Sequence, residues 1–135
     1  MNSEEIQNKI NNYLARCLWM NFTLCQSNFG KVELYGAVDQ TYNNYVDNYA
    51  IKIEFEWSHF VSSLFSWHTD TSRPVIQLVS AEELEIKTKY QVEQGNYIFK
   101  INAEDFEISP ILIAAKKITC KIVNESPFPK NEVQY

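Results

Sequence analysis

The sequence predicts an α+β fold in which one N-terminal helix is followed by about seven mostly antiparallel strands. Apolar residues recur at helical spacing over the first 17 residues, and from about residue 18 their spacing changes to two. Short links join the apolar runs that follow. We therefore expect a strongly bent sheet, either a sandwich or a partly open barrel, with the helix on one face or at one end.

The helix is predicted to begin after Asn2, whose side chain can cap it, with Glu5 completing a capping box three residues later. The apolar residues on one side are Ile6, Ile10, Tyr13, Leu14 and Cys17. This stripe is predicted to lie on the sheet, and a partner helix is the alternative.

The strands are expected at residues 18–25, 31–38, 49–57, 75–79, 84–92, 97–102 and 111–123. The clearest of them is 49–57, which alternates between two faces. Its inward side chains are predicted to be Tyr49, Ile51, Ile53, Phe55 and Trp57, and its outward ones Lys52, Glu54 and Glu56. Such alternation is typical of a half-buried antiparallel strand.

Three features of the sequence predict how neighbouring strands begin, end or connect. Gly95 can supply the positive φ of a hairpin turn at 93–96. Ser80 and Glu83 form a capping box, so one helical turn can precede the strand at 84–92. The step at 114–117 interrupts the last run and predicts a bulge or bend.

The chain of 135 residues predicts a single globular domain over residues 1–123. The tail at 124–135 is polar, contains two prolines, and is expected to fray. No residue pattern specifies an oligomeric state.

The net charge is −5, and the acidic excess lies in the first half. Residues 1–70 contain eight acidic and four basic residues, whereas residues 71–135 contain nine and eight. A nucleic-acid backbone would be repelled by the first half, so we expect no nucleic-acid partner. The one basic cluster is Lys116, Lys117 and Lys121, which is too small for a phosphate track and is expected to solvate a strand face.

The sequence is expected to be that of a reduced, cytoplasmic protein. Cys17, Cys25 and Cys120 are odd in number and lack the spacing of a zinc site, so each is expected to act as a small buried apolar residue. The N-terminus lacks a signal-peptide pattern, and no stretch has the ~20 apolar residues that span a membrane. We expect no cofactor.

The region that most resembles a catalytic or metal site is residues 58–74, which contain both histidines. His68 and Asp70 are two residues apart, so on a strand both could face a metal, with His59 as a third ligand. The favoured alternative is a turn in which Asp70 accepts backbone N–H groups. Ser62 and Ser63 lack the nucleophile elbow, and no other catalytic motif is present, so we do not expect an enzyme.

The favoured function is a small acidic intracellular protein-binding module, of the inhibitor or immunity type, which neutralises a basic partner. Residues 35–50 are rich in tyrosine, asparagine and aspartate. These residue types are suited to adaptable contacts with another protein. The predicted partner-binding residues are Asp39, Tyr42, Tyr45 and Asp47 in the link between two strands, with Glu54 and Glu56 on the outward face of the second strand.

Two other functions are weighed against this one. A bent sheet lined by aromatic residues could enclose an apolar ligand, as small barrels do. The aromatic residues concerned are Phe22, Tyr49, Phe55, Trp57, Tyr97 and Phe99. The favoured interpretation is that these rings fill the core. A metal-dependent or hydrolytic enzyme that uses His59, His68 and Asp70 is the least favoured.

Overall fold

The computed structural model describes residues 2–17, 19–26, 30–37, 49–58, 60–69, 71–79, 97–103 and 111–123. Over these residues the chain forms one helix and nine strands. They are α1 (Ser3–Ala15), β1 (Met20–Gln26), β2 (Val32–Ala37), β3 (Ile51–Glu56), β4 (Phe60–Ser62), β5 (Ser66–Thr69), β6 (Ile76–Leu78), β7 (Tyr97–Ile101), β8 (Ile111–Ala115) and β9 (Lys117–Ile122).

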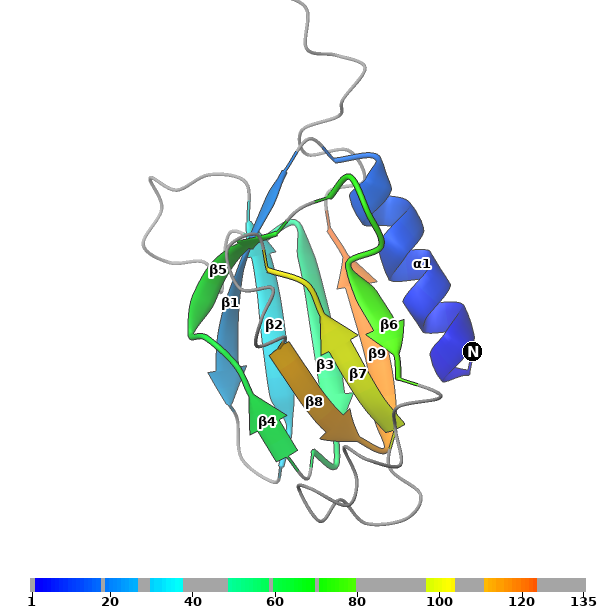
Figure 1. The fold of residues 1–135 in the computed structure, drawn as a ribbon, viewed down its shortest axis with the longest axis vertical. Coiled ribbons are helices and arrows are strands. Elements are labelled where there is room, and N and C mark those ends of the chain that lie inside the picture. Colours follow the sequence, from blue (N-terminus) through cyan, green and yellow to red (C-terminus); the bar gives the residue numbers. More distant parts are fainter. Residues whose placement is uncertain are drawn as a thin grey trace, which may run out of the picture.

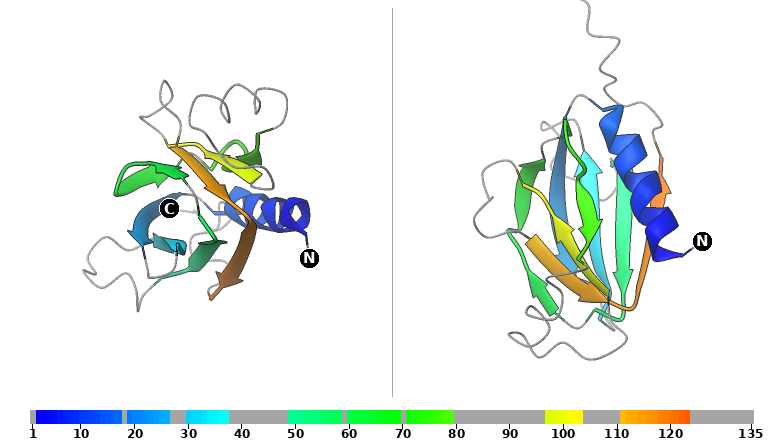
Figure 2. Two further views of the ribbon diagram at one scale, coloured as in Figure 1. Left: turned by 90° about the horizontal axis from the view of Figure 1, so that it is seen from below. Right: turned by 45° about the vertical axis from the view of Figure 1, so that its right-hand side comes forward.

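The strands form two open antiparallel sheets (Figure 1). The larger sheet has the order β5-β1-β2-β3-β9 and the smaller one the order β4-β8-β7-β6. Figure 2 shows that the two sheets lie against each other, with α1 along one side. Among the described residues no strand pairing closes the sheets into a barrel. The α+β character and the antiparallel pairing that the sequence predicted are thus confirmed.

The helix begins as its sequence predicts. The Asn2 side chain accepts a hydrogen bond from the Glu5 backbone N–H at 2.8 Å, which satisfies one of the free N–H groups of the first turn. Ile6, Ile10, Tyr13 and Leu14 are buried on one side. This side packs against β9 of the larger sheet and β6 of the smaller one, so the helix helps to hold the two sheets together.

Polar side chains of α1 also satisfy the open edge of β6. The Asn11 side-chain oxygen accepts hydrogen bonds from the Val75 and Ile76 N–H groups, both at 2.9 Å, and its amide donates to the Ile76 carbonyl at 2.8 Å. The Gln7 side-chain oxygen, one turn earlier, accepts from the Leu78 N–H at 2.7 Å. Asn11 and Gln7 therefore take the place of a neighbouring strand.

Aromatic rings from both sheets meet in the shared core. Phe55 on β3 and Phe99 on β7 are fully buried, and their ring centroids lie 5.3 Å apart in an edge-to-face arrangement. A second contact lies within the larger sheet, where the Phe22 and Trp67 rings are 5.9 Å apart. Phe22, Phe55 and Phe99 thus all belong to the packed core.

Gly36 on β2 is closely surrounded by core side chains. A methyl group added there would come within 2.7 Å of Ile51, 2.9 Å of Met20 and 3.0 Å of Phe22. Every one of these distances is at or below the shortest that real side chains tolerate, so glycine lets three core side chains close over the strand.

The last predicted strand is two strands. β8 and β9 belong to different sheets and are separated only by Lys116, so the interruption predicted at 114–117 is the bend by which the chain changes sheets. β4 and β5 were not predicted. The predicted strand at 84–92, the hairpin at 93–96 and the tail at 124–135 lie outside the described residues.

Candidate functional site

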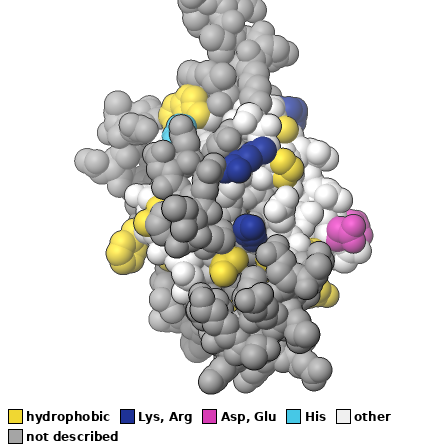
Figure 3. All heavy atoms as spheres, viewed as in Figure 1, with side chains coloured by type: hydrophobic (Ala, Val, Ile, Leu, Met, Phe, Trp, Pro, Cys, Tyr) yellow, Lys and Arg dark blue, Asp and Glu magenta, His cyan; other side chains and the backbone are white. Residues whose placement is uncertain are grey.

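Four exposed apolar side chains come from a short part of the chain that passes from the larger sheet to the smaller sheet and back. They are Trp57, Val61, Leu64 and Phe65, which we call the crossing residues. Trp57 is 67% exposed and Phe65 is 86% exposed. The described part of the chain has six exposed large apolar side chains, and the crossing residues are four of them. Figure 3 shows hydrophobic side chains at the left edge of the molecule, where Figure 1 places the link between β4 and β5.

Trp57 has an unusual backbone. Its φ is +57°, and it is the one described residue other than glycine with a positive φ. This conformation costs an L-residue about 1–2 kcal/mol. Two hydrogen bonds hold the next residue in place: the Ser58 N–H donates to the Gly30 carbonyl at 2.7 Å, and the Ser58 hydroxyl donates to the Phe55 carbonyl at 3.1 Å.

The alternation in 49–57 predicted that Trp57 points into the core, and this prediction is wrong. The positive φ ends the strand after Glu56 and turns the indole ring into solvent. Tyr49, at the other end of the same predicted strand, also lies outside the core. It is half-buried, and its ring meets that of Tyr35 edge to face at 5.2 Å.

Glu54 and Glu56 lie on the outward face of β3, as the alternation predicted, and each is paired with lysine. A Glu54 oxygen lies 3.0 Å from the Lys52 ammonium and the other 3.8 Å from the Lys31 ammonium. A Glu56 oxygen lies 3.9 Å from the Lys117 ammonium. The lysines offset much of the negative charge on this face. Asp39, Tyr42, Tyr45 and Asp47, which the sequence predicts to bind the same partner, lie outside the described residues.

Tyr35 lies on the same face, and its hydroxyl is hydrogen-bonded to a carboxylate. Its hydroxyl donates a 2.6 Å hydrogen bond to the Glu33 carboxylate. Burial raises the pKa of the Tyr35 hydroxyl far above its ordinary value, and the hydrogen bond to Glu33 raises it further. The pKa of the Lys52 ammonium is also raised, chiefly by its hydrogen bond to Glu54.

These two shifts predict a loss of stability in alkali. Unfolded tyrosine and lysine ionise near pH 10, whereas the folded protein keeps both protons to higher pH. Their stabilising contribution is therefore complete below about pH 10 and is lost as the pH rises through the folded pKa values. We expect Tyr35→Phe to make the fall in the free energy of unfolding between about pH 10 and pH 12 shallower. Urea unfolding at a series of pH values measures this slope, and equal slopes for both proteins would contradict the prediction.

His68 lies on β5 and is exposed. Its ring stacks on Trp19 with centroids 5.8 Å apart, and its Nδ1 lies 2.7 Å from the Asn21 side-chain oxygen. The other two proposed metal ligands, His59 and Asp70, lie outside the described residues. No group of three or more histidine, cysteine, aspartate or glutamate side chains suited to a metal occurs within the part of the chain that the structure describes.

The cysteines differ in their surroundings. All three are free; Cys17 is buried, as predicted, whereas Cys25 and Cys120 are only half-buried. Burial raises the pKa of the Cys120 thiol, which works against thiolate formation. This environment does not favour Cys120 as a nucleophile.

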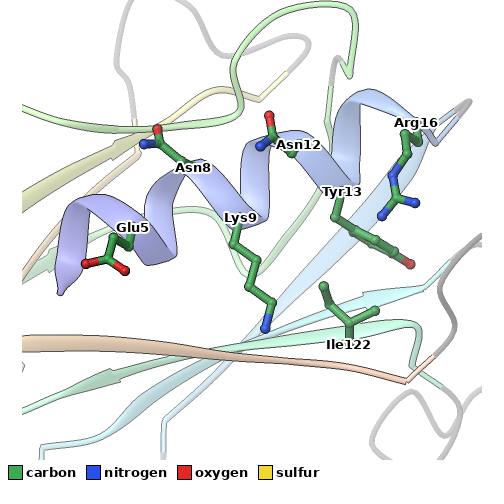
Figure 4. Close-up of a pocket in the computed structure, with 7 residues that line it drawn as sticks. All are labelled: Glu5, Asn8, Lys9, Asn12, Tyr13, Arg16 and Ile122. Carbon is green, nitrogen blue, oxygen red and sulfur yellow. The ribbon is translucent and has the colours of Figure 1, made fainter. Parts of the chain in front are cut away.

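A groove with a volume of about 460 Å³ lies between α1 and β9 (Figure 4). Its walls include Glu5, Lys9, Tyr13 and Arg16 from one side of the helix and Ile122 from the strand. The Arg16 guanidinium lies 5.7 Å from the centre of the Tyr13 ring, a distance at which a cation is attracted to an aromatic face. No sequence signal marked this groove, because it depends on how the helix lies on the sheet.

Comparison with models of protein families, with curated proteins and with solved structures found no match. Among the described residues no helix is long and apolar enough to cross a membrane. The functional inferences below therefore depend on the geometry of this chain.

Proposed function

We propose that this protein is a protein-binding module and that the crossing residues are part of its contact surface. The observation that carries the proposal is Trp57, an exposed indole on a backbone of positive φ. Strained residues in proteins cluster at sites of function, where the surrounding structure holds them. A glycine at this position would avoid the strain, so the tryptophan side chain is retained at a cost in stability.

The chemistry of the crossing residues supports a protein as the ligand. Tryptophan is among the residues enriched at the energetic centres of protein interfaces. Phe65, Leu64 and Val61 add apolar surface from the same part of the chain. Two large rings presented on backbone that is hydrogen-bonded to neighbouring strands would lose little conformational freedom on binding. One such contact is the 2.7 Å bond from the Leu24 N–H to the Phe65 carbonyl.

The partner we propose is a basic protein, which this chain would neutralise as an inhibitor or immunity-type protein does. The support is the net charge of −5 and the acidic excess in the first half of the sequence. Because Glu54 and Glu56 are paired with lysine, we expect attraction of a basic partner to depend more on Asp39 and Asp47. Tyr42 and Tyr45 would add contacts there.

Loss of the two exposed rings is expected to abolish partner capture. The experiment is affinity capture from the native host at low salt with wild type, with Trp57→Ala combined with Phe65→Ala, and with Val123→Ala. Val123 is 56% exposed and lies outside the crossing residues, which makes it a matched control. The purified partner should bind the double variant at least about 30-fold more weakly, as for a hot-spot tryptophan.

Three outcomes separate the parts of the proposal. Capture of a protein by wild type and Val123→Ala, but not by the double variant, would support the proposal that the crossing residues form part of the contact surface. Equal capture by all three proteins would contradict this proposal. The basic character of the partner is tested by salt, since association of oppositely charged proteins slows as ionic strength rises.

A further inference from the structure

Each sheet has an edge strand on the side where α1 lies, and the helix contacts these two strands, β6 and β9, differently. At β6 the groups that point away from the sheet are hydrogen-bonded to Asn11 and Gln7. At β9 no hydrogen bond between described residues comes from the helix. The same helix therefore satisfies one strand edge and leaves the other available.

The free edge of β9 can be located from its pairing. The Val123 N–H donates to the Ala50 carbonyl at 2.8 Å, and β9 pairs antiparallel with β3. Backbone groups in an antiparallel pair alternate between the partner strand and the opposite side. The N–H and C=O groups of Ile118, Cys120 and Ile122 therefore point away from β3. Ile118 is buried, whereas Cys120 and Ile122 are half-buried, so the edge is partly open only at the end that contains Cys120 and Ile122.

The groove between α1 and β9 runs beside this edge. Figure 4 shows Lys9 extending from the helix toward β9, and Tyr13 and Ile122 on facing walls. The Lys9 ammonium forms no ion pair or hydrogen bond in the described structure. An apolar side chain could contact Tyr13 and Ile122 while an anionic group reached Lys9.

Among the described residues, the charge around the edge is mainly positive. Lys9 and Arg16 stand on the helix side, and Lys117 and Lys121 are exposed on β9, against Glu5 within the groove and Glu56 beside Lys117. Lysines on an edge strand repel a second copy of the same strand. The same lysines attract an acidic strand, so the charge on this edge favours an acidic partner.

We propose that an extended acidic segment of another protein adds to β9 as a sixth strand, with one side chain in the groove beside α1. Strand addition of this kind takes affinity from backbone hydrogen bonds and specificity from side-chain pockets. Ile118 is buried, so the added segment would pair with the end of β9 that contains Cys120 and Ile122. The surface differs from the crossing residues, so this proposal can fail while the proposed function stands.

Synthetic peptides test strand addition directly. The probes are an eight-residue peptide that alternates valine and glutamate, the same peptide with lysine for glutamate, and the glutamate peptide with alternate backbone nitrogens methylated. Amide resonances of the labelled full-length protein are followed during titration. We expect the glutamate peptide alone to give saturable shifts centred on Cys120 and Ile122, with slower hydrogen exchange of these amides.

Matched variants test the groove. Lys9→Gln is expected to weaken binding of the glutamate peptide roughly two- to fivefold, the range for one exposed ion pair. Lys100→Gln makes the same charge change on β7 of the other sheet and is expected to leave the affinity unchanged. The proposal is overturned if the glutamate peptide does not bind at millimolar concentration, if the lysine or methylated peptide binds equally well, or if the shifts lie away from β9.

Discussion

Replacing Phe99 by alanine is expected to lower the free energy of unfolding by about 3–5 kcal/mol. Phe99 is fully buried on β7, and its ring meets Phe55 of the other sheet at 5.3 Å. Truncation removes the transfer free energy of the ring and leaves a cavity between two sheets that, among the described residues, no strand pairing joins. Urea unfolding followed by tryptophan fluorescence gives the change.

Phe65→Ala is the matched control, because it makes the same truncation at a side chain that is 86% exposed. We expect it to change the free energy of unfolding by less than about 0.5 kcal/mol. If Phe99→Ala lowered the free energy of unfolding no more than Phe65→Ala does, the contact between Phe99 and Phe55 would not be what holds the two sheets together.

Replacing Asn11 by alanine is expected to lower the free energy of unfolding by about 2–4 kcal/mol. The change removes the acceptor of the Val75 and Ile76 N–H groups and the donor to the Ile76 carbonyl. These groups are partly buried at the edge of β6, where loss of a partner costs about 1–3 kcal/mol for each buried group. Exchange of the Val75 and Ile76 amide protons should also accelerate.

Asn12→Ala controls for the helix itself. Asn12 is the next residue and is exposed, so both variants gain the same helix propensity from alanine, and only Asn11→Ala loses the contacts with β6. Asn12→Ala should leave stability unchanged or raise it by about 0.5 kcal/mol. Similar losses in both variants would mean that the helix does not satisfy this edge.

Those elements that local pattern determines could be predicted from the sequence. The helix has its cap at Asn2 and its buried stripe as expected, and the alternation of Ile51, Ile53 and Phe55 matches β3. Each of these features depends on residues within a few positions of one another. The spacing of apolar residues along one side is then sufficient to predict whether the segment is a helix or a strand.

Which strands pair, and in which sheet, could not be predicted, because strand pairing joins residues far apart in the sequence. β4 and β5 have only three and four residues, too few to show alternation. They become strands through their neighbours: β4 pairs with β8, and β5 pairs with β1.

The candidate site was predicted only in part, for the same physical reason. The outward position of Glu54 and Glu56 followed from alternation, but Lys31 and Lys117, which pair with them, come from other parts of the sheet. Trp57 continued the inward alternation, and only its backbone conformation turns it outward. A hydrogen bond from Ser58 to Gly30, 28 residues earlier, helps to hold that conformation, and no local pattern encodes it.

The most direct test of the account is Trp57→Gly, measured for both stability and binding. Glycine removes a strain of about 1–2 kcal/mol and loses about 0.5–1 kcal/mol in chain entropy. We therefore predict a free energy of unfolding that is unchanged or up to about 1.5 kcal/mol higher, together with at least about 30-fold weaker binding of the captured partner. A variant that unfolds more easily by over about 1 kcal/mol yet binds like wild type would show that Trp57 serves the fold, and would contradict the proposed function.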